Sequence, residues 1–157
     1  MKSRTKARSL ALQALYEIDI SGHAPNVVLQ ERFADSELER NMLSFAKRLV
    51  NDIVPMREEL DAFIAEHAPE WPIDQISIID RNLVRIAMWE FAVSEETPIK
   101  VAINEAVELA KYFGSDSAPR FVNGVLGSLA ERQNEIHQSF KTQREALQTA
   151  ISDEKSK

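Results

Sequence analysis

The chain has 157 residues, of which 44% are hydrophobic and 28% charged, and its formal net charge at pH 7 is -6. This length suits one domain with a buried core, the few glycines favour helices over strands, and the negative charge argues against indiscriminate nucleic-acid binding. The absence of cysteine excludes disulfides and indicates a reducing compartment, and no apolar run of about 18 residues is present to span a membrane, so we expect a cytoplasmic protein.

The first predicted helix carries a basic segment and ends at Gly22, a residue type that suits a helix terminus. Its apolar side chains recur at helical spacing and form one stripe. The stripe consists of Ala7, Leu10, Ala11, Ala14, Leu15 and Ile18. Residues 1–16 hold four cations and no acid, which is a charge asymmetry in an acidic chain. The cations are Lys2, Arg4, Lys6 and Arg8.

Two more helical segments are expected before residue 68. A short helix follows Pro25, and its inward-facing residues are Val28, Leu29 and Phe33. Asp35 or Ser36 would cap the next helix, because short polar side chains accept hydrogen bonds from free amides there. The inward-facing residues of this helix are Leu38, Met42, Phe45, Ala46, Leu49 and Ile53. Proline lacks a backbone donor, so Pro55 either kinks or breaks the helix before the apolar stripe resumes up to about His67.

The segment "APEWP" at 68–72 predicts a boundary between two halves, because prolines restrict their neighbours to extended backbone. Over residues 74–93 apolar side chains lie on most sides, which is typical of a central, buried helix. Pro98 opens another helix that stops at Gly114, and the turn "GSDSAP" leads to the last core helix. Residues 134–157 carry a sparse apolar stripe on a polar background, so they either continue as a helix or form a disordered tail.

The last core helix contains an internal glycine, Gly124, within "RFVNGVLGSL". Glycine inside a helix costs about 1 kcal/mol relative to alanine, so a reason for its presence is expected. Because glycine lacks a Cβ, we interpret Gly124 as a point where packed helices approach closely. Asn123 and Asn104 would then lie near such contacts and need hydrogen-bond partners if they are buried.

Four segments together resemble the signature of a known family. They are "ARSLALQALYEID", "DRNLVRIAMWEF", "PIKVAINEAVELAKYFGS" and "RFVNGVLGSL". Their order and spacing resemble the NusB family of transcription antitermination factors over roughly residues 4–132. The resemblance implies an all-α, NusB-like helical bundle of two three-helix subdomains. It predicts a domain at 1–133, with subdomains at about 1–67 and 72–133, and a charged C-terminal extension at 134–157 that is helical or disordered.

The resemblance also implies a function. Members of the family bind the boxA element of nascent ribosomal RNA transcripts together with NusE, the tenth protein of the small ribosomal subunit. The complex joins other Nus factors on RNA polymerase and suppresses premature termination. For this chain the resemblance therefore implies boxA-containing RNA and NusE as direct partners, and the other Nus factors and RNA polymerase as indirect ones.

The four N-terminal cations are the first candidates for RNA binding. They can pair with phosphates and release counterions, or the basic arm is a solvated terminus. Tyr16 lies at i+8 from Arg8, off the apolar stripe, so its ring either stacks on a base or packs against the other subdomain. Leu12, at i+4 from Arg8, is expected to pack.

Arg120 and Phe121 are further RNA-binding candidates, because they begin the last core helix and a helix N-terminus with free amides favours phosphate. The similar segment of the family, usually Lys-Phe, contributes to the RNA surface, although Phe121 would equally suit the core. The preceding turn departs from the family, whose members often carry two adjacent acids before a serine. Here Asp116 stands alone before Ser117, and Pro119 stiffens the turn.

Asp80 and Arg81 interrupt an otherwise apolar helix, where charges are costly unless they are paired or face water or a partner. The resemblance places this region near the surface that binds NusE. Both residues are therefore candidate partner-binding residues, and an intramolecular salt bridge is the alternative for each.

The sequence contains no pattern typical of catalysis or of a metal site. His23, His67 and His137 stand outside any recognisable motif. Glu105 and Glu108 share a helix face, but di-metal chemistry wants Glu-x-x-His on partner helices, and no Glu stands three residues before any His. We interpret the two glutamates as a solvated acidic face, and we expect a protein that is no enzyme and has no cofactor or metal.

A second function remains open from the sequence alone. The chain would equally suit a non-catalytic helical scaffold that binds proteins and whose basic arm touches no RNA. A NusB-like domain also occurs fused to RNA cytosine methyltransferases, but this chain has no room for the catalytic domain. The broad apolar coverage of residues 76–91 permits either a monomer or a homodimer.

Overall fold

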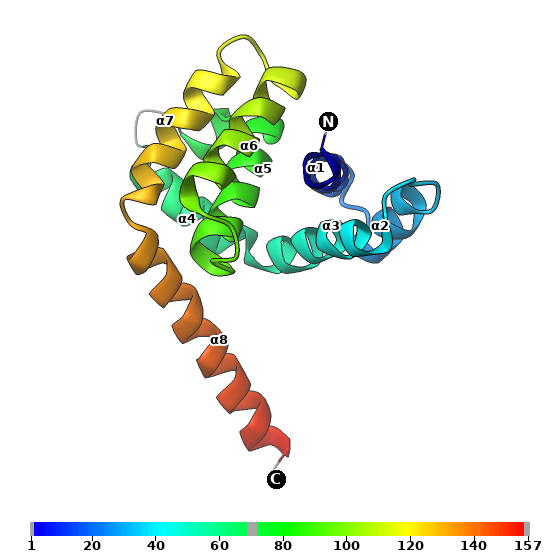
Figure 1. Cartoon of the computed structure of the whole chain (residues 1–157). Helices are drawn as coiled ribbons and strands as arrows, with labels where there is room; N and C mark the ends of the chain where they lie inside the picture. Colours follow the sequence, from blue (N-terminus) through cyan, green and yellow to red (C-terminus); the bar gives the residue numbers. More distant parts are fainter. Residues whose placement is uncertain (1, 69–71, 156–157) are drawn as a thin grey trace.

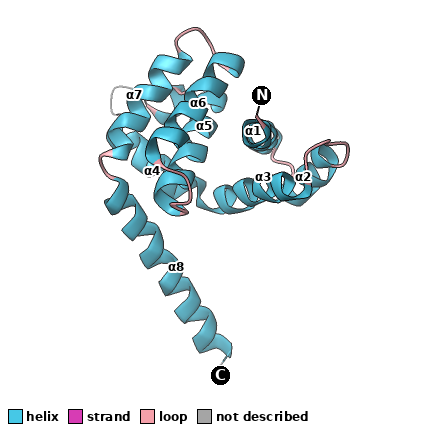
Figure 2. Cartoon of the chain, in the orientation of Figure 1, coloured by secondary structure: helices cyan, strands magenta, loops and turns pink. Residues whose placement is uncertain are grey.

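The computed structural model describes residues 2–68 and 72–155 (Figure 1). The described residues form only helices and connecting loops (Figure 2), which confirms the predicted all-α class. In chain order the α-helices are α1 (Ser3–Ser21), α2 (Pro25–Phe33), α3 (Arg40–Ile53), α4 (Arg57–His67), α5 (Ile78–Met88), α6 (Ile99–Phe113), α7 (Ala118–Ala130) and α8 (Gln133–Lys155). Shorter elements are the 3-10 helices η1 (Val54–Met56) and η2 (Ile73–Gln75) and the π-helix η3 (Trp89–Val93).

Helix α1 lies between the two groups of helices and packs against α2 and α3 on one side and α5 and α6 on the other. Its predicted apolar stripe is buried, except that Leu10 is half-buried. Gly22 ends the helix with a φ of 72°, and its N–H donates to the carbonyl of Ile18 at 3.0 Å. A left-handed backbone conformation is strained for most residues but costs glycine little, so Gly22 ends the helix as predicted.

The start of α3 differs from the prediction. Neither Asp35 nor Ser36 caps it, because the helix begins only at Arg40 and Glu39 occupies the N-cap position. The hydroxyl of Ser36 instead accepts a hydrogen bond from the amide of Leu38 at 3.2 Å, which stabilises the loop before the helix. Ser36, a residue type typical of helix N-caps, therefore stabilises a turn here.

Pro55 breaks the predicted long helix. It lies in η1, and the chain continues into α4 only after this turn. The boundary predicted at 68–72 includes residues 69–71, which lie outside the described residues. Although α4 precedes this boundary, it packs against α5 and α7, so by contact it groups with the helices that follow it.

The central helix α5 is buried on nearly every side, as the apolar pattern predicts. All residues from 82 to 93 are buried. The helix begins at Ile78 and not at Asp74, because the Ser77 hydroxyl caps it by accepting from the amide of Asp80 at 3.1 Å. After Met88 the backbone widens into η3, which the sequence pattern did not indicate.

The C-terminal extension is helical and projects away from the body (Figure 1). Its first turns are anchored to η3, since Gln133 donates to the carbonyl of Phe91 at 2.8 Å and the His137 ring lies 2.9 Å from the carbonyl of Ala92. Phe140 is also buried, whereas the side chains at 141–152 are exposed. The extension is thus packed at its start and solvated beyond it.

The glycine that permits a close approach is Gly114, and the interpretation of Gly124 is wrong. A Cβ built on Gly114 would lie 2.5 Å from the Cβ of Ala118 and 2.9 Å from the carbonyl oxygen of Ala110. A Cβ on Gly124 would have no neighbour within 4 Å among the described residues. Gly124 and Asn123 both lie on the exposed face of α7.

An ion-pair cluster ties the C-terminal end of α1 to α4 and α5. Asp19 accepts hydrogen bonds from Arg57 at 2.6 Å and from Arg85 at 2.8 Å, and the amide of Asn82 donates a third at 2.9 Å. Arg85 also binds both carboxylate oxygens of Asp61, at 2.8 and 2.6 Å. Burial opposes the charge of Asp19, but its three donors outweigh burial and hold the pKa of Asp19 below its ordinary value.

Alanine substitutions at the two glycines should have opposite effects. Gly124→Ala should raise the free energy of unfolding by about 0.5–1 kcal/mol, because the helix gains propensity and the added methyl meets open space. Gly114→Ala should lower it by about 1–3 kcal/mol, because the methyl overlaps Ala118 and the backbone. Urea unfolding measures both. Destabilisation by Gly124→Ala would show that a helix does pack there.

The substitution Asp19→Asn should lower the free energy of unfolding at pH 7 by about 1–3 kcal/mol, because buried Arg85 loses one of its two carboxylate partners and keeps Asp61. Folding lowers the pKa of Asp19, so its carboxylate stabilises the fold fully above the unfolded pKa, near 3.8, and the contribution is lost below that value as the pH falls through the lower folded pKa. Urea unfolding between pH 7 and pH 3 should therefore show the gap between wild type and variant narrowing below about pH 4. A gap that stays constant would contradict an ionic role.

Candidate functional site

The basic arm is the N-terminal turn of α1, and three of its four cations reach solvent. Lys2, Arg4 and Lys6 are exposed. The guanidinium of Arg4 lies over the ring of Phe45 of α3, 5.3 Å from its centroid, which steadies the side chain by a cation–π contact. The periodicity assigned Phe45 to the core, and nothing in the sequence connected it with the arm.

The prediction that Arg8 contacts RNA requires correction. Arg8 is only 2% exposed, and its Nε and Nη2 donate to the two carboxylate oxygens of Glu90 at 2.9 and 2.7 Å. Its Nη1 lies 3.4 Å from Glu105 of α6. Burial opposes the charge, but the two carboxylates outweigh burial and raise the pKa of Arg8 above its ordinary value. A guanidinium held in this way is not available to a phosphate.

The two other predictions on α1 have different outcomes. Leu12 is buried, which confirms that it packs. Tyr16 is 39% exposed, so part of its ring faces solvent and part faces protein. Base stacking by Tyr16 therefore stays a prediction.

The N-terminus of α7 offers fewer free amides than the sequence suggested. The helix begins at Ala118, whose amide already donates to the carbonyl of Ser115 at 3.0 Å, and Pro119 has no N–H. The amide of Phe121 donates to the carbonyl of Ser117 at 3.1 Å. The exposed side chain of Arg120, more than the backbone, is therefore what this terminus presents to an anion.

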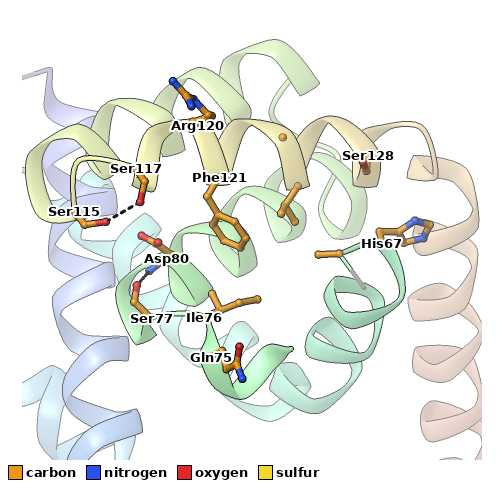
Figure 3. Close-up of a pocket in the computed structure, with 13 residues that line it drawn as sticks. His67, Gln75, Ile76, Ser77, Asp80, Ser115, Ser117, Arg120, Phe121 and Ser128 are labelled. Carbon is orange, nitrogen blue, oxygen red and sulfur yellow. Dashed lines mark hydrogen bonds between the residues drawn. The ribbon is translucent and has the colours of Figure 1, made fainter. Parts of the chain in front are cut away.

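A groove of about 710 Å³ lies between α7 and the segment that leads into α5. Its walls come from the end of α4, from η2, from the start of α5, and from α7 with the turn before it. The lining residues are His67, Ala68, Gln75, Ile76, Ser77, Asp80, Ser115, Ser117, Arg120, Phe121, Gly124, Val125 and Ser128. Figure 3 shows the Phe121 ring reaching from α7 into the groove, with Arg120 pointing outward at its edge.

Asp80 is the polar group buried in the wall of this groove. It is 8% exposed, and its Oδ1 has no hydrogen-bond partner in the described part of the chain. Burial raises the pKa of Asp80 above its ordinary value, and the hydrogen bond with Ser77 offsets this only in part. The intramolecular salt bridge considered for Asp80 is absent among the described residues, so this carboxyl holds a buried oxygen without a donor beside Gly114.

Arg81, unlike its neighbour Asp80, has hydrogen-bond partners for its charged group within the chain. Its guanidinium donates to the backbone carbonyls of Ile73 and Ile76, and so fastens η2 to α5. The internal partner is therefore the backbone and not a carboxylate. The fold brings Asp80, Arg120 and Phe121 to one groove, while Arg81 lies outside its lining.

Of the acidic pair on α6, Glu108 is exposed, as expected of a solvated acidic face, whereas Glu105 is half-buried. Glu105 accepts a hydrogen bond from the Thr5 hydroxyl at 2.7 Å, and Glu108 pairs with Lys111 at 3.0 Å. Within the described residues, no three His, Cys, Asp or Glu side chains are grouped so that they could hold a metal ion. None of the helices described is long and apolar enough to cross a membrane.

Comparisons with known proteins agree with this architecture. A model of the NusB family matches residues 5–131. The transcription antitermination protein NusB of Dehalococcoides mccartyi is 47% identical over 129 residues, which are 82% of this chain and 90% of that protein. The protein of the same name from Bacillus subtilis (strain 168) is 40% identical over 139 residues, covering 88% of this chain and 100% of its own length.

Two solved structures are similar as well. NusB of T. maritima is 28% identical with a TM-score of 0.76, over 82% of this chain and 90% of that one. A structure of the antitermination factors NusB and NusE in complex with double-stranded RNA contains a chain that is 27% identical with a TM-score of 0.73, over 88% of this chain and 98% of that one.

Substitution of Arg8 should lower the stability of the fold more directly than it lowers RNA binding. Arg8→Gln leaves the carboxylate of Glu90 buried without its partner, so we expect the free energy of unfolding to fall by about 3–5 kcal/mol. The matched control Lys6→Gln, an exposed cation two residues earlier, should change it by less than about 0.5 kcal/mol. Urea unfolding measures both. If Arg8→Gln were as stable as the control and yet lost RNA binding, the side chain would have to leave its pocket to bind RNA.

Proposed function

The chain belongs to the NusB family, and on that premise we propose that it is an RNA-binding transcription antitermination factor. It binds the boxA element of nascent ribosomal RNA transcripts together with NusE, and so promotes ribosomal RNA transcription in the cytoplasm. Other Nus factors and RNA polymerase join indirectly. The observation that carries the proposal is the exposed cationic turn at the start of α1, on a protein whose net charge is -6.

RNA binding is assigned to the exposed cations of the arm and to the edge of α7. Lys2, Arg4 and Lys6 pair with phosphates and release counterions, while Arg8 is reserved for the core. Arg120 adds a cation at the other end of this surface, and Tyr16 offers a partly exposed ring. Such a combination of cations and rings suits single-stranded RNA.

Partner binding is assigned to the groove beside α7. The buried Oδ1 of Asp80 lacks a donor, and a basic ribosomal protein would supply one as a lysine, an arginine or an amide if the carboxyl turned toward the groove. Gly124 lies in the groove lining with no neighbour within 4 Å of a built Cβ among the described residues, so the partner's backbone can approach α7 closely there. This gives the internal glycine a reason that packing within the chain does not.

The two surfaces are expected to depend on each other. The net charge of -6 opposes RNA, so three exposed cations give only modest affinity when the protein is alone. A basic partner in the groove adds positive charge to the shared surface and links two binding events into one complex. RNA affinity should therefore rise when NusE is present.

The proposal is tested by fluorescence anisotropy of a labelled boxA RNA and a scrambled RNA, each titrated with and without NusE. We expect tighter binding to boxA, tighter still with NusE, and a dissociation constant that rises with salt. Lys2→Glu with Lys6→Glu should abolish much of the binding without unfolding the protein, because both side chains are exposed. Equal binding of both RNAs by the protein alone would contradict the proposal.

Two exposed glycines of α7 provide a matched test of the groove. A Gln side chain at Gly124 should fill the groove and weaken NusE binding, whereas the same side chain at Gly127, outside the lining, should not. Both variants should fold, because neither position has a neighbour within 4 Å of a built Cβ among the described residues. Isothermal titration calorimetry with NusE measures the difference between the two variants. Equal affinities of the two variants for NusE would indicate that NusE binds outside the groove.

The scaffold without RNA binding remains the second candidate, and the burial of Arg8 is the observation that favours it. With Arg8 in the core, the arm has one cation fewer than the sequence suggested. The same titration separates the two functions. A complex with NusE that binds neither RNA would leave a scaffold and a solvated arm.

A further inference from the structure

One face of α6 carries an exposed aromatic residue that the RNA surface described so far does not use. Val101, Glu105, Glu108 and Tyr112 follow each other at helical spacing along this face. Tyr112 is 70% exposed, the highest fraction among the large apolar side chains of the described residues. A single exposed aromatic residue is ordinary on a protein surface, so a functional role for Tyr112 has to be argued from its surroundings.

The position of this face is fixed beside the basic arm. Glu105 accepts a hydrogen bond from Thr5 of α1 at 2.7 Å and lies 3.4 Å from the guanidinium of Arg8. Tyr112 follows Glu105 by seven residues, which places it about 10 Å further along the helix and within about 20° of the same direction. Tyr112 therefore lies on the side of α6 that faces α1. The printed contacts between the start of α1 and α6 lie at Glu105, one stretch of helix before Tyr112.

The ring of Tyr112 is held at a defined place. It meets the ring of Phe113 edge to face, with the centroids 4.8 Å apart and the planes at 67°. Both residues lie in the last turn of α6, just before Gly114 and the tight connection to α7. A largely exposed ring that is steadied by a neighbouring ring is a platform on which a base can stack at little entropic cost.

The carboxylates on the same face do not repel RNA at full strength. Glu105 is bound by Thr5 and neighbours the positive charge of Arg8, and Glu108 is paired with Lys111. Beyond Tyr112 the chain turns into α7, whose first turn presents Arg120. Along the chain Tyr112 thus stands between Glu105, which contacts α1, and the exposed Arg120 of α7.

We propose that Tyr112 is a base-stacking platform for single-stranded RNA, and that the strand passes over it between the basic arm of α1 and Arg120 of α7. The proposal rests on the RNA-binding function proposed above and adds a contact on α6. The ring supplies stacking that tolerates different bases, and the flanking cations hold the phosphates.

The test compares Tyr112→Ala with Tyr112→Phe, which keeps the ring, and with Val101→Ala on the same exposed face. Anisotropy with single-stranded boxA RNA should show on the order of 5- to 150-fold weaker binding for Tyr112→Ala, and wild-type affinity for the other two variants. A 2-aminopurine in the RNA should be quenched by the wild type and by Tyr112→Phe, but much less by Tyr112→Ala. NusE binding should be the same for all proteins.

The outcomes separate this proposal from the function on which it rests. If the wild type binds boxA and Tyr112→Ala binds it equally well, the stacking platform is wrong and RNA binding stands. If Tyr112→Phe is as weak as Tyr112→Ala, the hydroxyl and not the ring makes the contact, and stacking is again wrong. If the wild type binds no RNA, with or without NusE, both proposals fail together.

Discussion

The rest of the structure depends on the ion pairs that hold α1 at both of its ends. Near the N-terminus Arg8 is bound by Glu90 of η3, and near the C-terminus Asp19 is bound by Arg85 of α5. A buried ion pair contributes little net stability compared with an apolar pair, but losing one member leaves a buried charge that is very costly. These pairs therefore fix where α1 lies more than they add to the stability of the fold.

This constraint decides which parts of the molecule can meet RNA. Because Arg8 is anchored, the turn before it is held against α3 and α6, and its cations project from a defined place. The same anchoring brings Glu105, and with it the exposed face of α6, next to the arm. A basic terminus on a flexible tail would present the same charges in no fixed relation to Tyr112 or Arg120, and could not distinguish one RNA path from another.

The sequence predicted what depends on local periodicity and missed what depends on distant partners. The buried stripe of α1, the end at Gly22 and the buried central helix follow from spacing and residue type, and all three are confirmed. The burial of Arg8 could not be predicted, since its partner lies 82 residues away. The misreading of Gly124 has the same cause, because one helix pattern does not say which face its neighbours cover.

The candidate site shows why charge counts alone mislead. The arm was counted as four cations from the sequence, yet one of them neutralises an internal acid and three reach solvent. Asp80 was counted as one acid among many, yet it is the one whose buried oxygen lacks a donor in the groove lining. Under the proposed function, a partner that donates to Asp80 would remove the cost of this unpaired oxygen and bring its own cations to the groove that Arg120 lines. The proposal thus implies that the protein stays acidic in solution and presents a positive surface to RNA only in the complex, so that RNA binding is favoured where the partner is already present.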